Sequence, residues 1–439
     1  MDIFAAFFGL DDSDDSDSGI WSDVHAYKMP KANRSDLRDP AKASRLFDRR
    51  PFEAVQKVLS GGVLSLESQR RIGVMQGRCQ SDFNRVQVQK DFGLAPGNDK
   101  RAFTSRIGDE DLLILSKVFY VASPFLCRLD LSYNLIGDDG AKYLASLMGP
   151  RAEALSSLQL RSNAIGPEGC QALCEVLRST PLKRFDISMN PLGKEGGLML
   201  VSLVQRSPNL LELFMGDTEA DIDVLVSLAA VLRRHPSQLA VLDVQNPRIS
   251  TLQEDHTVHL GKMMRSNTKI TDLYLGKQRM RDEGARQLVD FLLENKVLRV
   301  LDLRCNELGA VSAYCLGTLL AHGSQLVSLN LSCNRIGEKN NVDGAKALAE
   351  GLVHNSHLEH LDLNHNELCG QALSLLGESL QHSTKLVSLR LFHNHWDQPS
   401  SYLFHTLLTG RSKGVPLKAD FRTSEVDQQI HISKLEVDR

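Results

Sequence analysis

The chain has 439 residues, of which 42% are hydrophobic and 24% are charged, and its formal net charge is −3. So small a net charge gives no indication of a nucleic-acid partner. No run of residues approaches the ~20 consecutive apolar side chains of a membrane span. We therefore expect an ordinary soluble protein, with no nucleic-acid ligand and no membrane span.

The first 44 residues are unlike the rest of the chain in composition. Residues 1–23 contain seven Asp and neither Lys nor Arg, whereas residues 24–44 carry five Lys or Arg against two Asp, and contain Pro. We expect residues 1–44 to form a disordered acidic tail and a basic linker. Phe4, Phe7 and Phe8 would share one face of a helical turn, which predicts a docking peptide for a second contact with a protein partner. The plainer alternative is a disordered tail with an apolar tip.

Residues 45–97 are predicted to form a helical N-terminal capping region. Apolar residues recur at helical spacing between residues 45 and 60, and Gly61-Gly62 then ends the pattern. The sequence that follows, up to residue 97, mixes polar and apolar residues without a clear period.

From residue 126 onward a single frame recurs, L-x-x-L-x-L-x-x-N-x-L, and it is clearest in LRVLDLRCNEL at residues 298–308. Ten copies, called repeats one to ten here, begin at residues 126, 155, 182, 210, 239, 270, 298, 326, 358 and 386. The leucines at the fourth and sixth frame positions point the same way in a short strand. One such strand cannot bury its apolar face alone, so the copies are expected to stack into a parallel sheet with a helix behind each strand.

The repeat region is predicted to span residues 98–411. The triplet Ile107-Gly108-Asp109 matches Ile136-Gly137-Asp138 of repeat one, which indicates a capping half-repeat that begins near residue 98. Residues 412–439 would form a C-terminal cap. The frame's Asn is expected to turn inward and form a hydrogen-bonded spine. Thr218, Pro247 and Gln278 replace it in repeats four to six.

This frame, with helical runs such as GDDGAKYLASLM between the strands, resembles the leucine-rich repeat family of the ribonuclease-inhibitor type. Relatives of that type include RanGAP and the sensing domains of NLR proteins. The resemblance implies an α/β solenoid shaped like a horseshoe. Its parallel β-sheet would line the concave face, and its helices would cover the convex face.

The fifth frame position should form one file of side chains along the concave face, since neighbouring strands lie ~4.8 Å apart. Five Asp occur in this file, with two aromatic residues among them. Such a surface would suit a basic protein partner with an apolar anchor. The alternative is that Asp is only a soluble filler on a strand face. The candidate partner-binding residues, with one Asp from the third position, are Asp186, Phe214, Asp243, Asp272, Tyr274, Asp302 and Asp362.

No motif for catalysis or nucleotide binding is present in the sequence: there is no phosphate-binding loop, no H-E-x-x-H and no G-x-S-x-G. Zinc-ligand residue types occupy the eighth frame position in repeats seven to ten, as Cys305, Cys333, His365 and His393. A straight file cannot place four ligands tetrahedrally around one ion. We therefore expect no catalytic residues, metal or cofactor.

The eight Cys lack the spacing of a disulfide framework, which favours a reducing compartment: the cytoplasm, with the nucleus and the cilium as alternatives. The predicted function is that of a non-enzymatic scaffold or adaptor. It would bind a protein partner on its concave face, within a larger complex. The alternative, by resemblance, is a RanGAP-like regulator of a small GTPase.

Overall fold

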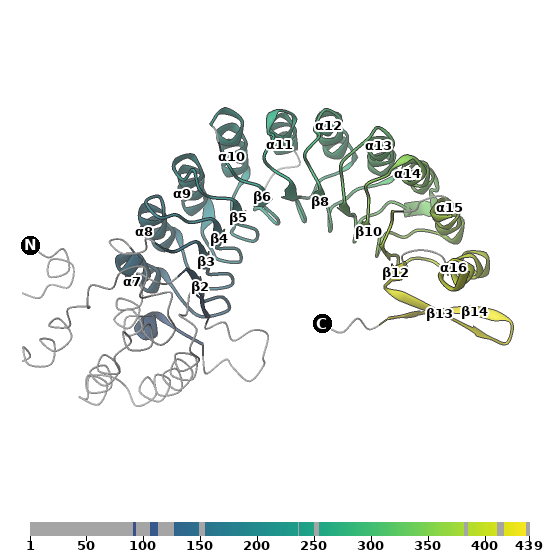
Figure 1. The fold of residues 1–439 in the computed structure, drawn as a ribbon, viewed down its shortest axis with the longest axis horizontal. Coiled ribbons are helices and arrows are strands. Elements are labelled where there is room, and N and C mark those ends of the chain that lie inside the picture. Colours follow the sequence, from purple (N-terminus) through teal and green to yellow (C-terminus); the bar gives the residue numbers. More distant parts are fainter. Residues whose placement is uncertain are drawn as a thin grey trace, which may run out of the picture.

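The computed structural model describes residues 91–93, 106–112, 127–148, 154–235, 237–249, 254–381, 385–410 and 417–435. Over these ranges strands and helices alternate and build a curved solenoid, with the strands on its inner side and the helices on its outer side (Figure 1). The predicted acidic tail, with Phe4, Phe7 and Phe8, and the basic linker lie outside the described residues. No helix within the ranges has the length and hydropathy of a membrane span.

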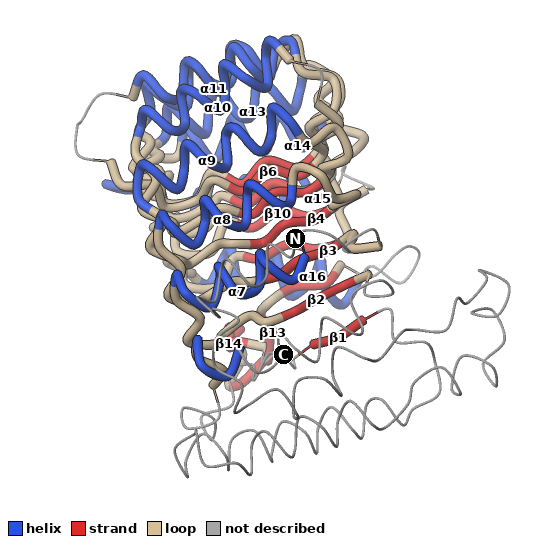
Figure 2. Tube along the Cα trace, turned by 90° about the vertical axis from the view of Figure 1, so that its left-hand side faces the viewer, coloured by secondary structure: helices blue, strands red, loops and turns tan. Residues whose placement is uncertain are grey.

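Twelve strands of the described residues form one sheet whose order follows the chain. Figure 2 shows these short strands lying one above another. The strands are β1 (Asp91–Gly93), β2 (Arg128–Asp130), β3 (Ser157–Gln159), β4 (Arg184–Asp186), β5 (Glu212–Phe214), β6 (Val241–Asp243), β7 (Asp272–Tyr274), β8 (Val300–Asp302), β9 (Ser328–Asn330), β10 (His360–Asp362), β11 (Ser388–Arg390) and β12 (Lys418–Ala419).

Each of the strands β2 to β11 covers the third to fifth positions of one predicted repeat, so the predicted frame is confirmed in all ten copies. Neighbouring strands pair in parallel with the frame in register, as in Leu301 opposite Leu329 and Asp302 opposite Asn330. Residues at the same frame position therefore lie side by side along the solenoid.

A helix follows each of the strands β2 to β11 and lies behind the sheet (Figure 1). A short 3-10 helix, η4 (Glu338–Asn340), precedes α14 in repeat eight. The α-helices are α7 (Asp138–Met148), α8 (Pro167–Leu177), α9 (Gly193–Arg206), α10 (Ile222–Arg234), α11 (Asp255–Ser266), α12 (Asp282–Leu292), α13 (Ala310–Ala321), α14 (Asp343–His354), α15 (Gly370–Leu380) and α16 (Gln398–Gly410). The predicted α/β horseshoe is thus the fold of the chain.

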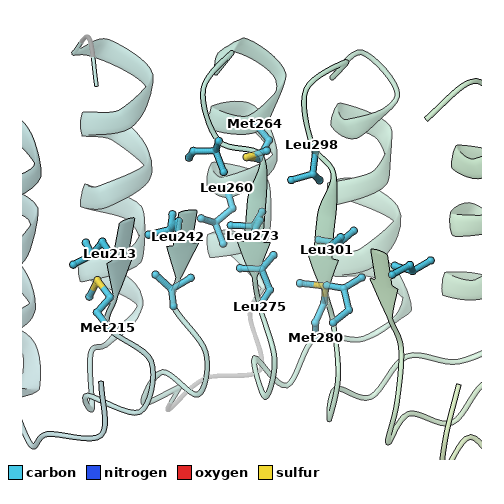
Figure 3. Packing of buried hydrophobic residues seen from close by; sticks show 14 of the residues in the cluster. Leu213, Met215, Leu242, Leu260, Met264, Leu273, Leu275, Met280, Leu298 and Leu301 are labelled. Atoms are coloured by element: carbon cyan, nitrogen blue, oxygen red, sulfur yellow. The ribbon is translucent and has the colours of Figure 1, made fainter. Parts of the chain in front are cut away.

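The core is a continuous apolar layer between the sheet and the helices. In repeat seven the frame leucines Leu298, Leu301, Leu303 and Leu308 are at most 4% exposed. Figure 3 shows how such side chains from neighbouring repeats fill the space between the strands and the helices. Each strand buries only one or two large side chains, so its stability depends on the repeats beside it.

The predicted asparagine spine is present, and Asn306 shows its geometry. The Asn306 amide donates to the backbone carbonyls of Leu303 in its own repeat, at 2.8 Å, and Leu275 in the repeat before, at 3.0 Å. Its oxygen accepts from the backbone N–H groups of Gln278 and Met280, at 2.8 and 3.1 Å. One buried side chain thus satisfies four backbone groups that the strand ladder leaves unpaired.

The spine is interrupted in repeats four to six. Thr218 makes one side-chain bond, from its hydroxyl to the Met215 carbonyl at 2.8 Å. Gln278 reaches the Val244 carbonyl, but its own side-chain oxygen is buried without a partner. Pro247 has a ring in place of an amide side chain and cannot donate. In these three repeats the spine position therefore makes fewer hydrogen bonds than it does in the repeats on either side.

A second inter-repeat link, which the sequence did not predict, joins the helices. An acidic side chain at the start of one helix accepts hydrogen bonds from the N-terminal N–H groups of the next. The Asp282 carboxylate, at the start of α12, accepts from Gly309 and Ser312 at 2.8 and 2.9 Å. Asp138 does the same for Gly166 and Gly169. These carboxylates satisfy N–H groups that a helix leaves unpaired, and they lie at the positive end of its dipole.

The two ends of the solenoid add detail to the predicted boundaries. The first strand of the sheet is β1, which pairs Phe92 with Leu129 and lies before residue 98, where the repeats were predicted to begin. At the other end β12 joins the sheet, and β13 (Phe421–Val426) and β14 (Gln429–Lys434) form an antiparallel hairpin. Phe421 of the hairpin contacts Trp396 and Phe404 of repeat ten, so the hairpin covers the last part of the core.

Candidate protein-binding surface

The concave surface consists of the side chains at the third, fifth and seventh frame positions of β2 to β11. Residues at the fifth position follow one another across the sheet, as in Asp186 opposite Phe214 and Phe214 opposite Asp243. Tyr274 and Asp302 continue the same file. The structure therefore brings the predicted candidates Asp186, Phe214, Asp243, Tyr274 and Asp302 into one row, and Asp362 lies further along it.

The aspartates of this row are engaged with the backbone. Asp186, Asp243, Asp302 and Asp362 each accept a hydrogen bond from the N–H two residues later, at 2.9–3.1 Å. Asn330 does the same in repeat eight, at 3.0 Å. The side chain at the fifth position thus closes the turn that ends each strand. The sequence suggested only a soluble filler or a binding group, and the turn gives this Asp a structural role.

Three carboxyl groups of the row are almost completely buried, and burial raises the pKa of each. Asp186, Asp243 and Asp302 are only 5–6% exposed. Loss of solvent raises the pKa of each of these carboxyl groups, and it also raises the pKa of Asp362. For Asp243 the strand register explains the loss of solvent: Phe214 and Tyr274 lie opposite it on the two neighbouring strands, and their aromatic side chains flank the carboxyl group.

Phe214 is half-buried and lies beside an arginine. The Arg184 guanidinium carbon is 4.4 Å from the centre of the Phe214 ring, and Arg184 also pairs with Glu212. The cation and the ring attract each other, which holds both side chains on the concave surface. The ring does not belong to the hydrophobic core cluster. Its exposed part is therefore free for contact with another molecule.

Tyr274 is also half-buried and outside the core cluster. Burial raises the pKa of its phenol, and the negative charges of Asp272, Asp302 and Asp243 raise it further. Asp272, at the third frame position of the same strand, accepts a hydrogen bond from the Thr271 hydroxyl. Tyr274 thus presents a neutral ring and hydroxyl within an acidic part of the surface.

Arg304 forms a bridge across the surface that sequence reasoning missed. Its guanidinium donates to Gln245 Oε1 at 2.7 and 3.1 Å, although one repeat lies between them. Gly276 occupies the seventh position of that repeat, and a Cβ there would lie 2.7 Å from Gln245 Oε1. A missing side chain in repeat six is therefore what lets Arg304 span two strands. The only sequence signal was the Gly in a position that usually carries a polar residue.

We expect Asp243→Asn to stabilise the protein at neutral pH. Asparagine can keep the hydrogen bond to the Gln245 N–H, as Asn330 does in repeat eight, without the cost of burying a charge. Because burial raises the Asp243 pKa, the wild-type group favours the fold below its unfolded pKa, and this contribution is lost as the pH rises through the folded pKa. Thermal unfolding at pH 7 should therefore show a rise of roughly 2 °C, shrinking towards pH 4. A fall at pH 7 would contradict this account.

Groups for metal binding are absent from the described residues: no three His, Cys, Asp or Glu side chains there are placed to hold an ion. His365 and His393 stack on each other with ring centres 4.0 Å apart, which fills the space between them. The predicted docking residues Phe4, Phe7 and Phe8 lie outside the described residues, so their role stays a prediction.

The repeat pattern also matches known proteins. The sequence profile of the family described as "Leucine Rich repeat" matches residues 122–145, 154–174, 178–201, 294–317 and 354–376. The gap between residues 201 and 294 contains repeats four to six, in which Thr218, Pro247 and Gln278 replace the spine Asn.

Three similar proteins come from the mouse. Leucine-rich repeat-containing protein 34 is 30% identical over 340 residues, which cover 77% of this chain and 80% of that protein. Ribonuclease inhibitor is 26% identical over 311 residues, covering 64% of this chain and 61% of that protein. NACHT, LRR and PYD domains-containing protein 12 is 25% identical over 283 residues, covering 57% of this chain and 26% of that protein. With its frame, its fold and these relatives, the chain belongs to the leucine-rich repeat family.

Proposed function

We propose that the chain is a non-enzymatic scaffold or adaptor in the cytoplasm, and that its concave surface binds a protein partner within a larger complex. Leucine-rich repeat proteins generally mediate protein–protein interaction, and the name of the ribonuclease inhibitor describes a protein that acts on another protein. The observation that carries the proposal is the pair Phe214 and Tyr274. Both are large side chains without a place in the core, on a row where the described repeats otherwise carry polar or charged residues.

The chemistry around this pair favours a basic partner with an apolar anchor. Asp272 and Glu212 are half-buried on β7 and β5, the strands that carry the two aromatic residues, although Glu212 also pairs with Arg184. The almost buried Asp243 and Asp302 on β6 and β8 add to the negative potential of this part of the surface. An apolar or aromatic partner side chain would cover the rings, and Lys or Arg side chains would offset the negative charge. Aromatic anchors of this kind contribute a large share of interface energy.

The RanGAP-like alternative stays a prediction, because no feature of the described concave surface favours it. Its test is simple. GTP hydrolysis by a panel of small GTPases would be measured with and without the protein, and acceleration of any one of them would support a regulator.

A photo-crosslinking residue placed at position 214 tests the proposed surface in a native extract. We expect it to capture a protein partner, and excess wild-type protein should prevent the capture. The double variant Phe214→Ala, Tyr274→Ala should compete roughly 10- to 100-fold less well, which corresponds to about 1.4–2.7 kcal/mol for the loss of two interface aromatics.

Tyr314 supplies the matched control, because it is an aromatic residue on α13 at the convex side and is 61% exposed. A Tyr314→Ala variant should compete as well as the wild type, and a crosslinker at position 314 should not capture the same protein. Equal competition by the double variant and the wild type would show that Phe214 and Tyr274 do not hold the partner.

A further inference from the structure

The eighth frame position forms a second row of side chains, beside the concave surface. In all ten repeats the residue at this position has a left-handed backbone, with φ between 50° and 61°. In repeats one to nine its N–H donates to the carbonyl at the seventh position of the next repeat, as Cys305 does to Ser332 and Cys333 to Asn364, both at 2.8 Å. Every repeat therefore presents this side chain in the same way, and neighbours stand side by side.

Contacts between neighbours in this row confirm the arrangement. Asp217 and Asn246 of repeats four and five are hydrogen-bonded through their side chains. His365 and His393 of repeats nine and ten stack with ring planes 17° apart. Whatever pair of residues occupies adjacent positions of the row can thus make direct side-chain contact.

Cys305 and Cys333 are such a pair, in repeats seven and eight. Both thiols are free, Cys333 is exposed and Cys305 is half-buried. Burial raises the pKa of Cys333 to about 11, and the charge of Cys305 and a hydrogen bond from the Cys333 thiol to Cys305 add to the rise, which indicates that the two sulfur atoms are neighbours. Strands one step apart in the sheet are separated by ~4.8 Å, which lies within the Cα separation of ~4.4–6.8 Å that a disulfide needs.

The fold itself does not call for cysteine at these two positions. Neither residue belongs to the hydrophobic core cluster. The row accepts residues as different as Tyr133, Ser162 and Lys277 with the same backbone conformation. The two thiols therefore are not needed to pack the core, and they give this part of the solenoid two reactive groups.

We propose that Cys305 and Cys333 form a redox-sensitive thiol pair, which a small disulfide such as oxidised glutathione converts to a disulfide bond between repeats seven and eight. A protein thiolate attacks the small disulfide, forms a mixed disulfide and releases one small thiol. The second protein thiol loses its proton, and its thiolate attacks the protein sulfur of the mixed disulfide and releases the second small thiol. The protein pair gives up two electrons and two protons, which the small disulfide takes up as two thiols.

The high pKa of Cys333 slows the steps in which this residue is the attacking thiolate. Thiolate at Cys333 is scarce near neutral pH, so the pair should react slowly there and faster as the pH rises.

The full-length protein, incubated with oxidised glutathione at pH 8 and digested without reduction, tests the proposal. We expect a peptide pair linked through Cys305 and Cys333. In a Cys305→Ser variant, Cys333 should instead end as a mixed disulfide with glutathione. Serine fits this backbone, since Ser162 occupies the same frame position with φ 56°.

An internal control comes from Cys170 and Cys174 of α8, whose sulfur atoms are 3.9 Å apart but whose side chains are buried. They should stay reduced while the protein is folded. The proposal would be overturned if Cys305 and Cys333 each carried glutathione, or stayed free, without a linked peptide. A link between Cys170 and Cys174 in place of the expected one would equally overturn it.

Discussion

An Asn306→Ala variant is expected to unfold with a free energy about 3–5 kcal/mol lower than that of the wild type. The Asn306 side chain makes four hydrogen bonds of 3.1 Å or shorter to backbone groups of two repeats and is 6% exposed. Alanine would remove the partner of the Leu275 carbonyl and of the N–H groups of Gln278 and Met280, whereas the Leu303 carbonyl would keep its bond from the Asn334 amide. Each buried group left without a partner costs roughly 1 kcal/mol or more. Urea unfolding followed by circular dichroism measures the difference.

Two further variants serve as comparisons, one with a smaller expected loss of stability and one with almost none. Thr218→Ala removes one spine bond, to the Met215 carbonyl, and should cost about 1 kcal/mol. Asn209→Ala changes an exposed asparagine in the turn before β5 and should have little effect. If Asn306→Ala were no more costly than Asn209→Ala, the spine would not contribute to stability in the way the hydrogen bonds indicate.

Acidification is expected to destabilise the protein through His256. This side chain, in α11, is 1% exposed and neither ring nitrogen has a hydrogen-bond partner. Burial lowers the pKa of His256 to about 4 from its usual 6.5, an effect that the charge of Asp255 only partly opposes. The unfolded chain therefore takes up the proton first, so this stability is present above pH 6.5 and is lost as the pH falls towards 4.

A His256→Leu variant isolates this effect. Between pH 7 and pH 5 the wild type should lose about 2 kcal/mol more unfolding free energy than the variant, because one pKa unit corresponds to ~1.4 kcal/mol. Urea unfolding at the two pH values gives the comparison. His322 is exposed at the end of α13, and a His322→Leu variant should follow the wild type. Equal losses in the wild type and in His256→Leu would rule out a buried neutral imidazole.

The repeat frame predicted the fold well, because its leucines encode burial directly. All ten strands β2 to β11 lie where the frame placed them. The strand β1 was not recognised, since its residues Asp91–Gly93 carry no leucine pair and only Phe92 aligns with a frame leucine. The hairpin of β13 and β14 likewise falls where the periodic pattern has ended, so only a polar cap was expected there.

The candidate surface was predicted in outline but not in its contacts. Periodicity placed Phe214, Asp243 and Tyr274 in one row, as the register confirms. It could not show that Asp243 closes a turn and loses its solvent, because this depends on side chains of neighbouring strands. Periodicity likewise could not show that Arg304 reaches across Gly276, or that His256 is buried, because both depend on contacts with residues distant along the sequence.

The interrupted spine has a consequence for how binding would act on the whole molecule. Repeats four and six carry Phe214 and Tyr274, and these same repeats carry Thr218 and Gln278 in place of the spine Asn. A ligand held there would span the part of the solenoid whose asparagine spine is interrupted, and its binding energy would add to the stability of that part. Occupancy should therefore slow backbone amide hydrogen exchange most in β5 to β7, and leave the well-bonded ends of the arc almost unchanged.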